Sequence, residues 1–285
     1  MKRVVLSSIV TLLFLSSGCS EETILKEEKQ NHAGETSHVK GEEDDISSNE
    51  APLSEQELRF MFSDVKSYMG RDVHFTGRVF SVEKDADGVY LQVWQDPDAL
   101  NNNTIIGYTD STLDVKEDDY VEVLGTIADE FEGENAFGGV VTAPVIRAEE
   151  INVLTYKEAI APTVLEVEIN EEISQHGYIV KVQKIEFAAN ETRVYVEVEN
   201  DSNEKINVWI YDTKLIQGSR QFDVEYNYDA DYPEIQSTIN PGIQSEGIFT
   251  FAPLDHEGGE LTFVIEGSSD DWEVEIQPFT FEIVW

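Results

Sequence analysis

The sequence predicts an all-β protein in which a five-stranded barrel with one N-terminal helix precedes a two-sheet β-sandwich. Apolar and polar residues alternate with period two over many short segments, as they do in strands with one buried face. Turn residues such as Asp87-Gly88 and Gly138-Gly139 separate these segments. Apolar residues at helical spacing mark the segment 54–70, whereas residues 19–53 are too polar to build a core. We therefore expect a disordered N-terminal tether ahead of two folded domains.

The first nineteen residues have the composition of an export signal. Met1-Lys2-Arg3 is basic, residues 4–15 are mainly apolar, and the small residue Gly18 precedes Cys19. An apolar run of about a dozen residues is too short to cross ~30 Å of hydrocarbon, which needs roughly 20 residues. The pattern resembles a bacterial lipoprotein signal. We expect residues 1–18 to be a signal peptide that is removed and Cys19 to carry the lipid.

Cys19 is the only cysteine in the 285 residues, so it has no disulfide partner. A thioether-linked lipid would remove the liability of a free thiol in an oxidising compartment. We therefore expect an extracytoplasmic, palmitate-bearing protein held on the outer face of the cell membrane. The tether 19–53, with its acidic run from Glu42 to Asp45, would hold the folded domains off the membrane. His32 and His38 within it are expected to be solvated rather than metal-bound.

The formal net charge of -39 limits the classes of partner. Residues 71–155 contain 5 basic and 18 acidic residues, a balance of -13, and residues 171–285 contain 6 and 24, a balance of -18. Neither domain offers the basic face that phosphate groups require. Nucleic acid and anionic lipid headgroups are thus poor partners. An acidic surface favours the solubility of an exported protein.

The first folded domain is expected over residues 54–155. Ser54 and Glu57 form a capping box ahead of a helix that ends at Gly70. The apolar face of this helix comprises Leu58, Met61, Phe62, Val65 and Met69. Short strands are then expected at 72–82, 88–95, 104–109, 119–127 and 143–153. Five strands of this kind suit a small, partly closed barrel.

Residues 70–79, 117–126 and 138–148 resemble the extracytoplasmic OB-fold domains of bacterial lipoproteins, which are related to the anticodon-binding barrel. The third segment, in which glycines lead into a Thr-x-Pro-x-Ile strand, is the most specific. The resemblance implies a barrel whose sheet face and flanking loops bind oligonucleotides or oligosaccharides. Because the domain is acidic, a glycan or a peptide is the expected ligand. The candidate binding residues are Tyr90, Trp94 and Tyr108, with Phe131 and Phe137 in the fourth loop; the alternative is that these rings fill the core.

A linker is expected over residues 156–172, where Ala161-Pro162 breaks any regular element. The second domain, residues 173–285, contains about seven short strands in roughly 110 residues without helical periodicity, which favours a two-sheet sandwich. The expected strands are 177–187, 192–200, 206–217, 220–226, 246–252, 260–266 and 272–284.

Three segments of this domain, residues 194–203, 226–233 and 240–249, resemble an immunoglobulin-like domain of unknown function. It recurs in lipoproteins of Gram-positive bacteria and is described as similar to a telomeric-repeat-binding factor. The turn Pro241-Gly242 leading to Gly247 is the distinguishing piece. The resemblance implies a fold and carries no biochemical activity with it.

Motifs for catalysis are missing from the sequence. His74, His176 and His256 are scattered over both domains, and no nucleophile elbow, zinc-binding His-Glu-x-x-His or phosphate loop is present. Acidic loops could hold calcium, the candidates being Asp85, Asp87, Asp96, Asp98 and Asn101 in the barrel and Asp229, Asp231 and Glu234 in the sandwich. None of these residues matches the twelve-residue calcium loop, and ordinary turns are the favoured explanation, because Asp and Gly favour turn conformations. We expect no resident metal or cofactor.

The sequence thus predicts a membrane-anchored, non-enzymatic binding or adaptor protein of the cell envelope. Its partner would be an envelope protein or a glycan, and the membrane itself would be reached through the lipid. One alternative is a glycan-binding module that uses the barrel face. Another is an envelope hydrolase, or an inhibitor of envelope enzymes, without a recognisable motif.

Overall fold

The computed structural model describes residues 51–97, 99–134 and 138–285. The expectations for the signal peptide, the tether and Cys19 lie outside these residues. The described chain forms two compact units, of which the first comprises residues up to Glu117 and Val123–Ile151 and the second comprises Asp118–Glu122 and Asn152–Trp285. Strands account for most of the structure, so the predicted all-β fold is confirmed. Within the described chain, no helix combines the length and apolar character needed to span a bilayer.

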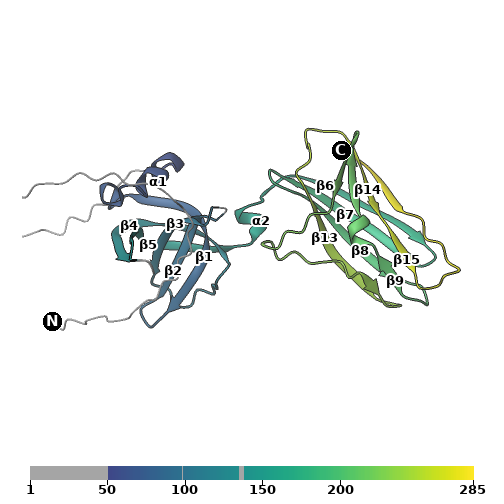
Figure 1. Ribbon diagram of the computed structural model, residues 1–285, viewed down its shortest axis with the longest axis horizontal. Helices are drawn as coiled ribbons and strands as arrows, with labels where there is room; N and C mark the ends of the chain where they lie inside the picture. The colour runs from purple at the N-terminus through teal and green to yellow at the C-terminus, as the bar shows by residue number, and fades with distance from the viewer. Residues whose placement is uncertain (1–50, 98, 135–137) are drawn as a thin grey trace, which may run out of the picture. The chain divides into compact units, whose positions relative to one another are not determined.

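The first unit is built around a closed barrel with strand order β1-β2-β3-β5-β4 (Figure 1). Strands β1 and β2 and strands β2 and β3 pair antiparallel, whereas β3 and β5 pair parallel. Alternate residues fill the interior, as Val89, Leu91 and Val93 of β2 show by being fully buried. The predicted five-stranded barrel is therefore present. Its strands are β1 (Asp72–Lys84), β2 (Val89–Asp96), β3 (Asn101–Tyr108), β4 (Tyr120–Glu134) and β5 (Val140–Leu154).

The N-terminal helix is shorter than the sequence predicts. Helix α1 (Glu55–Met61) begins with the expected capping box of Ser54 and Glu57 and buries Leu58 and Met61. The segment that follows is a separate 3-10 helix, η1 (Val65–Tyr68), which is capped by Asp64. Asp64 accepts a hydrogen bond from Ser67 and so starts a new turn, which interrupts the single helix expected up to Gly70. As a result Met69, expected on the apolar face, is exposed.

The linker between the domains is also shorter than expected. Helix α2 (Tyr156–Ala159) has a capping box formed by Thr155 and Glu158. Strand β6 (Thr163–Gln175) begins directly after Pro162 and pairs along its length with β7 (Tyr178–Ala188). Residues 163–172, assigned to the linker by the sequence, therefore belong to the second unit.

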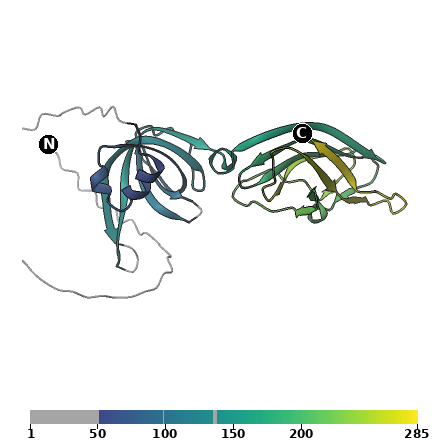
Figure 2. The same ribbon diagram turned by 90° about the horizontal axis from the view of Figure 1, so that it is seen from above.

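The second unit is a β-sandwich whose two layers are visible from above (Figure 2). One layer has the order β13-β8-β7-β6, and the other contains the sheets β11-β10-β14-β16 and β12-β9-β15. Apolar residues of facing strands, such as Val196, Phe249 and Phe263, form the core between them. The remaining strands are β8 (Thr192–Asn200), β9 (Ile206–Val208), β10 (Lys214–Gln217), β11 (Arg220–Asp223), β12 (Thr238–Ile239), β13 (Gln244–Phe251), β14 (Glu260–Ile265), β15 (Gly267–Ser269) and β16 (Phe279–Val284).

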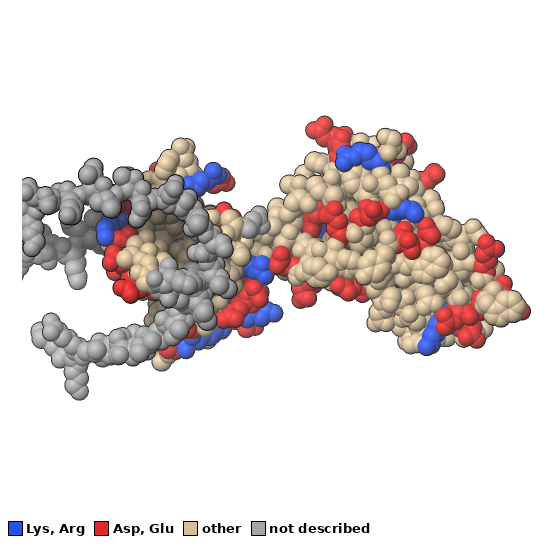
Figure 3. Space-filling view, in the orientation of Figure 1, with Lys and Arg blue, Asp and Glu red and all other residues tan. Residues whose placement is uncertain are grey.

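One expected strand of the sandwich is interrupted and another is shorter than expected. The strand predicted over 206–217 is divided into β9 and β10 by the 3-10 helix η2 (Ile210–Asp212). This break occurs because β9 and β10 belong to different sheets, so the chain has to change sheet between them. The strand predicted over 272–284 begins only at Phe279. Acidic side chains are spread over the face of the sandwich drawn in Figure 3, as the charge balance leads one to expect.

Candidate functional site

The barrel residues proposed to bind a ligand do not share one face. Tyr90 and Trp94 alternate with the buried residues of β2 and so point outward, where Tyr90 is 44% exposed. Trp94 is stacked on Phe80, with ring centroids 4.4 Å apart. Tyr108 pairs with buried Val89 and follows the inward alternation of β3. Two of the three predicted residues therefore lie on the outer face of β2, and the third does not.

The two phenylalanines expected in the fourth loop are placed differently from one another. Phe131 lies within β4 and is exposed. Phe137 lies outside the described residues. The barrel thus presents Tyr90 and Phe131 as exposed rings, on strands β2 and β4.

A second set of exposed aromatic residues lies on the sandwich and was not assigned as a site from the sequence. Tyr211, Tyr226 and Tyr228 form a row, with ring centroids 5.9 Å apart for the first pair and 6.1 Å for the second. Tyr228 is 90% exposed and Tyr211 is 82% exposed. Large exposed rings in a cluster are characteristic of binding surfaces rather than of an inert exterior. We call these three residues the tyrosine row.

Two members of the tyrosine row, Tyr226 and Tyr228, line a cavity of about 240 Å³. Buried Ile235 and Phe249 contribute apolar lining, while Tyr226 and Tyr228 contribute their rings. The same two tyrosines also line an adjoining cavity of about 290 Å³. A concave surface with apolar lining and a few polar groups is the usual form of a small-ligand site. These cavities with the tyrosine row make up the candidate site.

Three carboxylates line the cavity of about 240 Å³, namely Glu225, Asp231 and Glu234, and its lining contains no lysine or arginine. Among the described residues, none of the three forms an ion pair within 4 Å. The site therefore combines ring faces with negative charge that is not neutralised locally.

Most of these residues belong to one segment, residues 224–235 between β11 and β12, which we call the tyrosine loop. Both ends of the loop are fixed to β13. Glu225 exchanges hydrogen bonds with Thr250, through its amide and its carbonyl, and the amide of Ile248 donates to the carbonyl of Pro233 at 2.8 Å. A loop held at both ends presents its side chains with a small loss of entropy on binding.

The middle of the tyrosine loop is fixed by a single carboxylate, Glu191. Its Oε2 accepts from the side-chain amide of Asn227 at 2.9 Å, and its Oε1 accepts from the hydroxyl of Tyr232 at 2.6 Å. Arg193 donates to the same Oε1 at 2.7 Å. Because Asn227 precedes Tyr228 and Tyr232 follows it four residues later, these contacts fix the loop on both sides of Tyr228.

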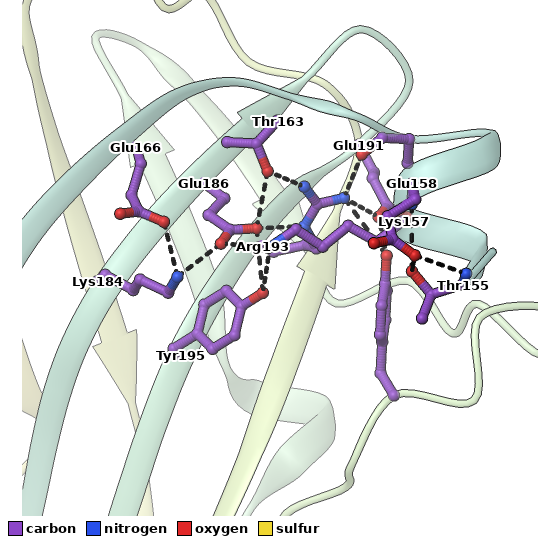
Figure 4. Close-up of polar contacts among 12 residues, drawn as sticks. Thr155, Lys157, Glu158, Thr163, Glu166, Lys184, Glu186, Glu191, Arg193 and Tyr195 are labelled. Atoms are coloured by element: carbon purple, nitrogen blue, oxygen red, sulfur yellow. Dashed lines mark hydrogen bonds and ion pairs between the residues drawn. The ribbon is translucent and has the colours of Figure 1, made fainter. Parts of the chain in front are cut away.

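Arg193 connects the loop to a buried polar network (Figure 4). Its Nε lies 3.0 Å from Oε2 of Glu186, and both side chains are fully buried. Its two terminal nitrogens donate to the Ala161 carbonyl and to the Thr163 hydroxyl, both at 2.8 Å. A buried arginine needs several acceptors to offset its desolvation, and this set supplies them.

Glu186 accepts hydrogen bonds at both of its oxygens. Lys157 lies 2.6 Å and Lys184 lies 2.7 Å from Oε1, while Thr163 and Tyr195 donate to Oε2 at 3.0 Å. Burial alone would raise the pKa of Glu186, but the hydrogen bonds from Lys157, Lys184 and Tyr195 outweigh burial and hold the pKa well below its usual range. The carboxylate stays ionised with its lone pairs occupied, so it serves structure rather than proton transfer.

The electrostatics of the tyrosine row agree with a negative site. Burial is the main cause that raises the pKa of Tyr226 to about 12. A hydrogen bond with Tyr211 and the nearby charge of Glu234 also contribute to this rise in the pKa. Tyr226 is therefore neutral at physiological pH and presents an uncharged ring face.

The acidic turns considered for calcium have local explanations in the barrel. Asp85 accepts from the amides of Asp87 at 2.7 Å and Gly88 at 3.1 Å, which closes the hairpin turn. Asp96 accepts from the amide of Ala99, and Asp98 lies outside the described residues. In the described part of the chain, no three His, Cys, Asp or Glu side chains are grouped as a metal site.

No protein-family model matches the chain, and a search of curated proteins found no match. Among solved structures, a functionally unknown protein from Listeria monocytogenes EGD-e is similar over 44% of this chain and 86% of that chain. The TM-score is 0.34 and the sequence identity is 10%.

The sequence contained a usable signal for the tyrosine row. Tyr226, Tyr228 and Tyr232 fall within seven residues, in a segment that lacks the alternation of a strand. Clustered tyrosines outside regular elements cannot all fill a core, which points to a surface role. The contribution of Tyr211 had no such signal, because it reaches the row only through the break between β9 and β10.

Proposed function

We propose that this protein is a lipid-anchored, non-catalytic binding protein on the outer face of the cell membrane, and that it holds an envelope ligand at the tyrosine loop. The observation that carries the binding role is the tyrosine row: Tyr226 and Tyr228 line a cavity, and the loop that carries them is bonded to a buried network through Asn227 and Tyr232. The lipid anchor rests on the basic start, the short apolar run and Cys19.

Binding rather than catalysis is supported by how the charged groups are used. Glu186, whose pKa is strongly lowered, has both oxygens occupied by lysines, a threonine, a tyrosine and Arg193. General acid or base catalysis needs a group whose pKa lies near the working pH and which can reach a substrate proton. Glu186 meets neither requirement, whereas its position suits a scaffold for the tyrosine loop.

The anchor is tested by metabolic labelling with palmitate in a bacterial host that exports lipoproteins. We expect the mature chain to incorporate label and the Cys19→Ala variant to lose it. Label that persists in Cys19→Ala would show that the lipid is attached elsewhere or that the signal was misread.

The binding role is tested by photo-crosslinking in intact cells. A crosslinking amino acid at position 228 is expected to yield adducts with an envelope component. The matched control is position 284, which is also highly exposed and lies on β16, at the opposite edge of its sheet from β11. Equal adduct formation at both positions, or none at 228, would contradict a specific site.

A second candidate is glycan binding by the barrel, because the stacked pair Phe80 and Trp94 and exposed Tyr90 lie on outward positions. Aromatic faces can stack on sugar rings without any basic residue. Retention of the protein on purified cell wall that is lost in Trp94→Ala and kept in Tyr228→Ala would favour the barrel. The reverse result would assign the glycan to the tyrosine loop.

A further inference from the structure

The ligand class at the tyrosine loop follows from the chemistry of its lining, and this step rests on the proposed binding function. The lining combines two kinds of group that attract the same type of ligand. Tyr226 and Tyr228 offer the negative faces of their rings, and Glu225, Asp231 and Glu234 add formal negative charge. An anion would be repelled by both groups, and a neutral apolar ligand would leave the carboxylates without a counter-charge.

Organic cations fit this lining better than metal ions. A hard cation such as calcium prefers several oxygen ligands at short range. Ring faces cannot replace water in such a shell, so Tyr226 and Tyr228 would contribute little to it. A weakly hydrated ammonium group gains from ring faces and carboxylates together, as in aromatic cages that take methylated ammonium groups.

The size of the cavity narrows the ligand further. Its volume of about 240 Å³ is below the ~300–1,000 Å³ typical of pockets that enclose a drug-sized molecule. This cavity therefore takes one small group, and the adjoining cavity of about 290 Å³ leaves room for the rest of a larger molecule. Tyr228, being 90% exposed at the border, is placed to cover that group from the solvent side.

We propose that the tyrosine loop binds an alkylammonium group, with the cation against the rings of Tyr226 and Tyr228 and its charge balanced by Asp231 and Glu234. The group can be a soluble small molecule or the end of a larger envelope molecule, since both present the same chemistry. Arg193 does not oppose the cation, because Glu186 and Glu191 both pair with it.

The test is calorimetric titration of the full chain carrying Cys19→Ala, with choline as the cation and 3,3-dimethylbutan-1-ol as its uncharged analogue of the same shape. We expect choline to bind about tenfold or more tightly than the neutral analogue. Affinities that agree within a factor of about two, or no heat with millimolar choline, would overturn the proposal.

Variants separate the ring and charge contributions. Tyr228→Ala is expected to weaken choline binding about tenfold, whereas Tyr228→Phe keeps the ring face and most of the affinity. Glu234→Gln should weaken binding, whereas Glu282→Gln removes the same charge from an exposed position on β16 and should leave it unchanged. Because Tyr228 is so exposed, its loss leaves the fold intact, which circular dichroism verifies. Equal effects of the two charge variants would contradict a local site.

The crosslinking experiment at position 228 distinguishes the possible failures. Adducts with an envelope component, combined with no preference for choline, would keep the binding function and reject the ammonium ligand. If the protein prefers choline over the neutral analogue but position 228 gives no adduct with an envelope component, the ligand is a soluble molecule. Adducts that choline displaces would assign the end group of a larger molecule.

Discussion

The two fully buried charged residues Arg193 and Glu186 form the centre of an ion-pair network in the sandwich, in which Arg193 also pairs with Glu191. Removing Arg193 takes the cation away from the nearly buried Glu191 and leaves Glu186 paired with Lys157 and Lys184; breaking a buried pair in this way typically costs about 3–5 kcal/mol. We therefore expect Arg193→Met to lower the free energy of unfolding of the sandwich by about 3–5 kcal/mol, measured by urea denaturation. The control is Glu166→Gln, which removes the partly exposed ion pair with Lys184 and should cost less than about 1 kcal/mol. Equal costs would show that the buried pair is not important for stability.

The low pKa of Glu186 makes stability depend on pH in a defined direction. In the unfolded chain its pKa is near the usual 4.5, whereas lysine and tyrosine hydrogen bonds hold it lower in the folded chain. The unfolded state therefore binds the proton first, so the contribution is complete above about pH 4.5 and is lost as the pH falls below it.

We expect the native chain to lose stability more steeply than Glu186→Gln below about pH 4.5, by up to about 1.4 kcal/mol per pH unit. Urea midpoints of both proteins, measured between neutral pH and pH ~3, test this. The other carboxylates are common to both proteins, so their effect cancels when the midpoint of Glu186→Gln is subtracted from that of the native chain. Parallel curves would mean that Glu186 has an ordinary pKa in the folded state.

At the scale of elements, Gly247 in β13 allows the tyrosine loop to pack closely. A Cβ at this position would lie 2.5 Å from the amide nitrogen of Ile235 and 2.9 Å from the carbonyl oxygen of Pro233. Both are backbone atoms, so Gly247→Ala should displace the loop, reduce stability by about 1–3 kcal/mol and weaken ligand binding. Gly107→Ala is the control, because its Cβ would meet only the Tyr90 ring at 3.8 Å. Unchanged binding in Gly247→Ala would show that the loop is not positioned by this contact.

Alternation predicted most strands because one face of each is buried. In β8, Val194, Val196 and Val198 face the core as expected. The pattern could not predict that Arg193 on the outward face is fully buried, since its cover comes from Ala161, Thr163 and Tyr232, which are distant in sequence. The alternation also could not predict the break between β9 and β10. The chain changes sheet there, and such a change leaves no regular pattern of apolar and polar residues.

The candidate site was harder to predict than the fold. In the barrel, we predicted Tyr90, Trp94 and Tyr108 as binding residues. The alternation of inward and outward side chains places Tyr90 and Trp94 outside the barrel, but it places Tyr108 on the inward side of β3. The tyrosine loop has no alternation at all. Its form depends on hydrogen bonds from Glu191 and on the close approach of Gly247, which only the folded chain reveals.

At the scale of the whole molecule, charge is the dominant property. The formal net charge is -39, and both folded parts contribute, with -13 over residues 71–155 and -18 over residues 171–285. Like charges repel more strongly in the compact state than in the expanded unfolded chain, so they reduce stability. This repulsion is long-range and is screened by salt, whereas the buried pair of Arg193 and Glu186 is screened much less.

Raising sodium chloride from ~0.01 M to ~0.15 M shortens the screening length from about 30 Å to about 8 Å and should stabilise the full chain carrying Cys19→Ala. A gain of about 1 kcal/mol would raise the unfolding temperature by about 2–4 °C, which scanning calorimetry resolves. Potassium chloride serves as the control. Screening depends only on ionic strength, so both salts should give the same shift, whereas stabilisation by a specific sodium site would appear with sodium chloride alone. Choline chloride at the same ionic strength should stabilise the sandwich beyond this common shift, since a ligand that binds only the folded state adds its own contribution. An unfolding temperature that falls with salt would mean that surface ion pairs outweigh the repulsion.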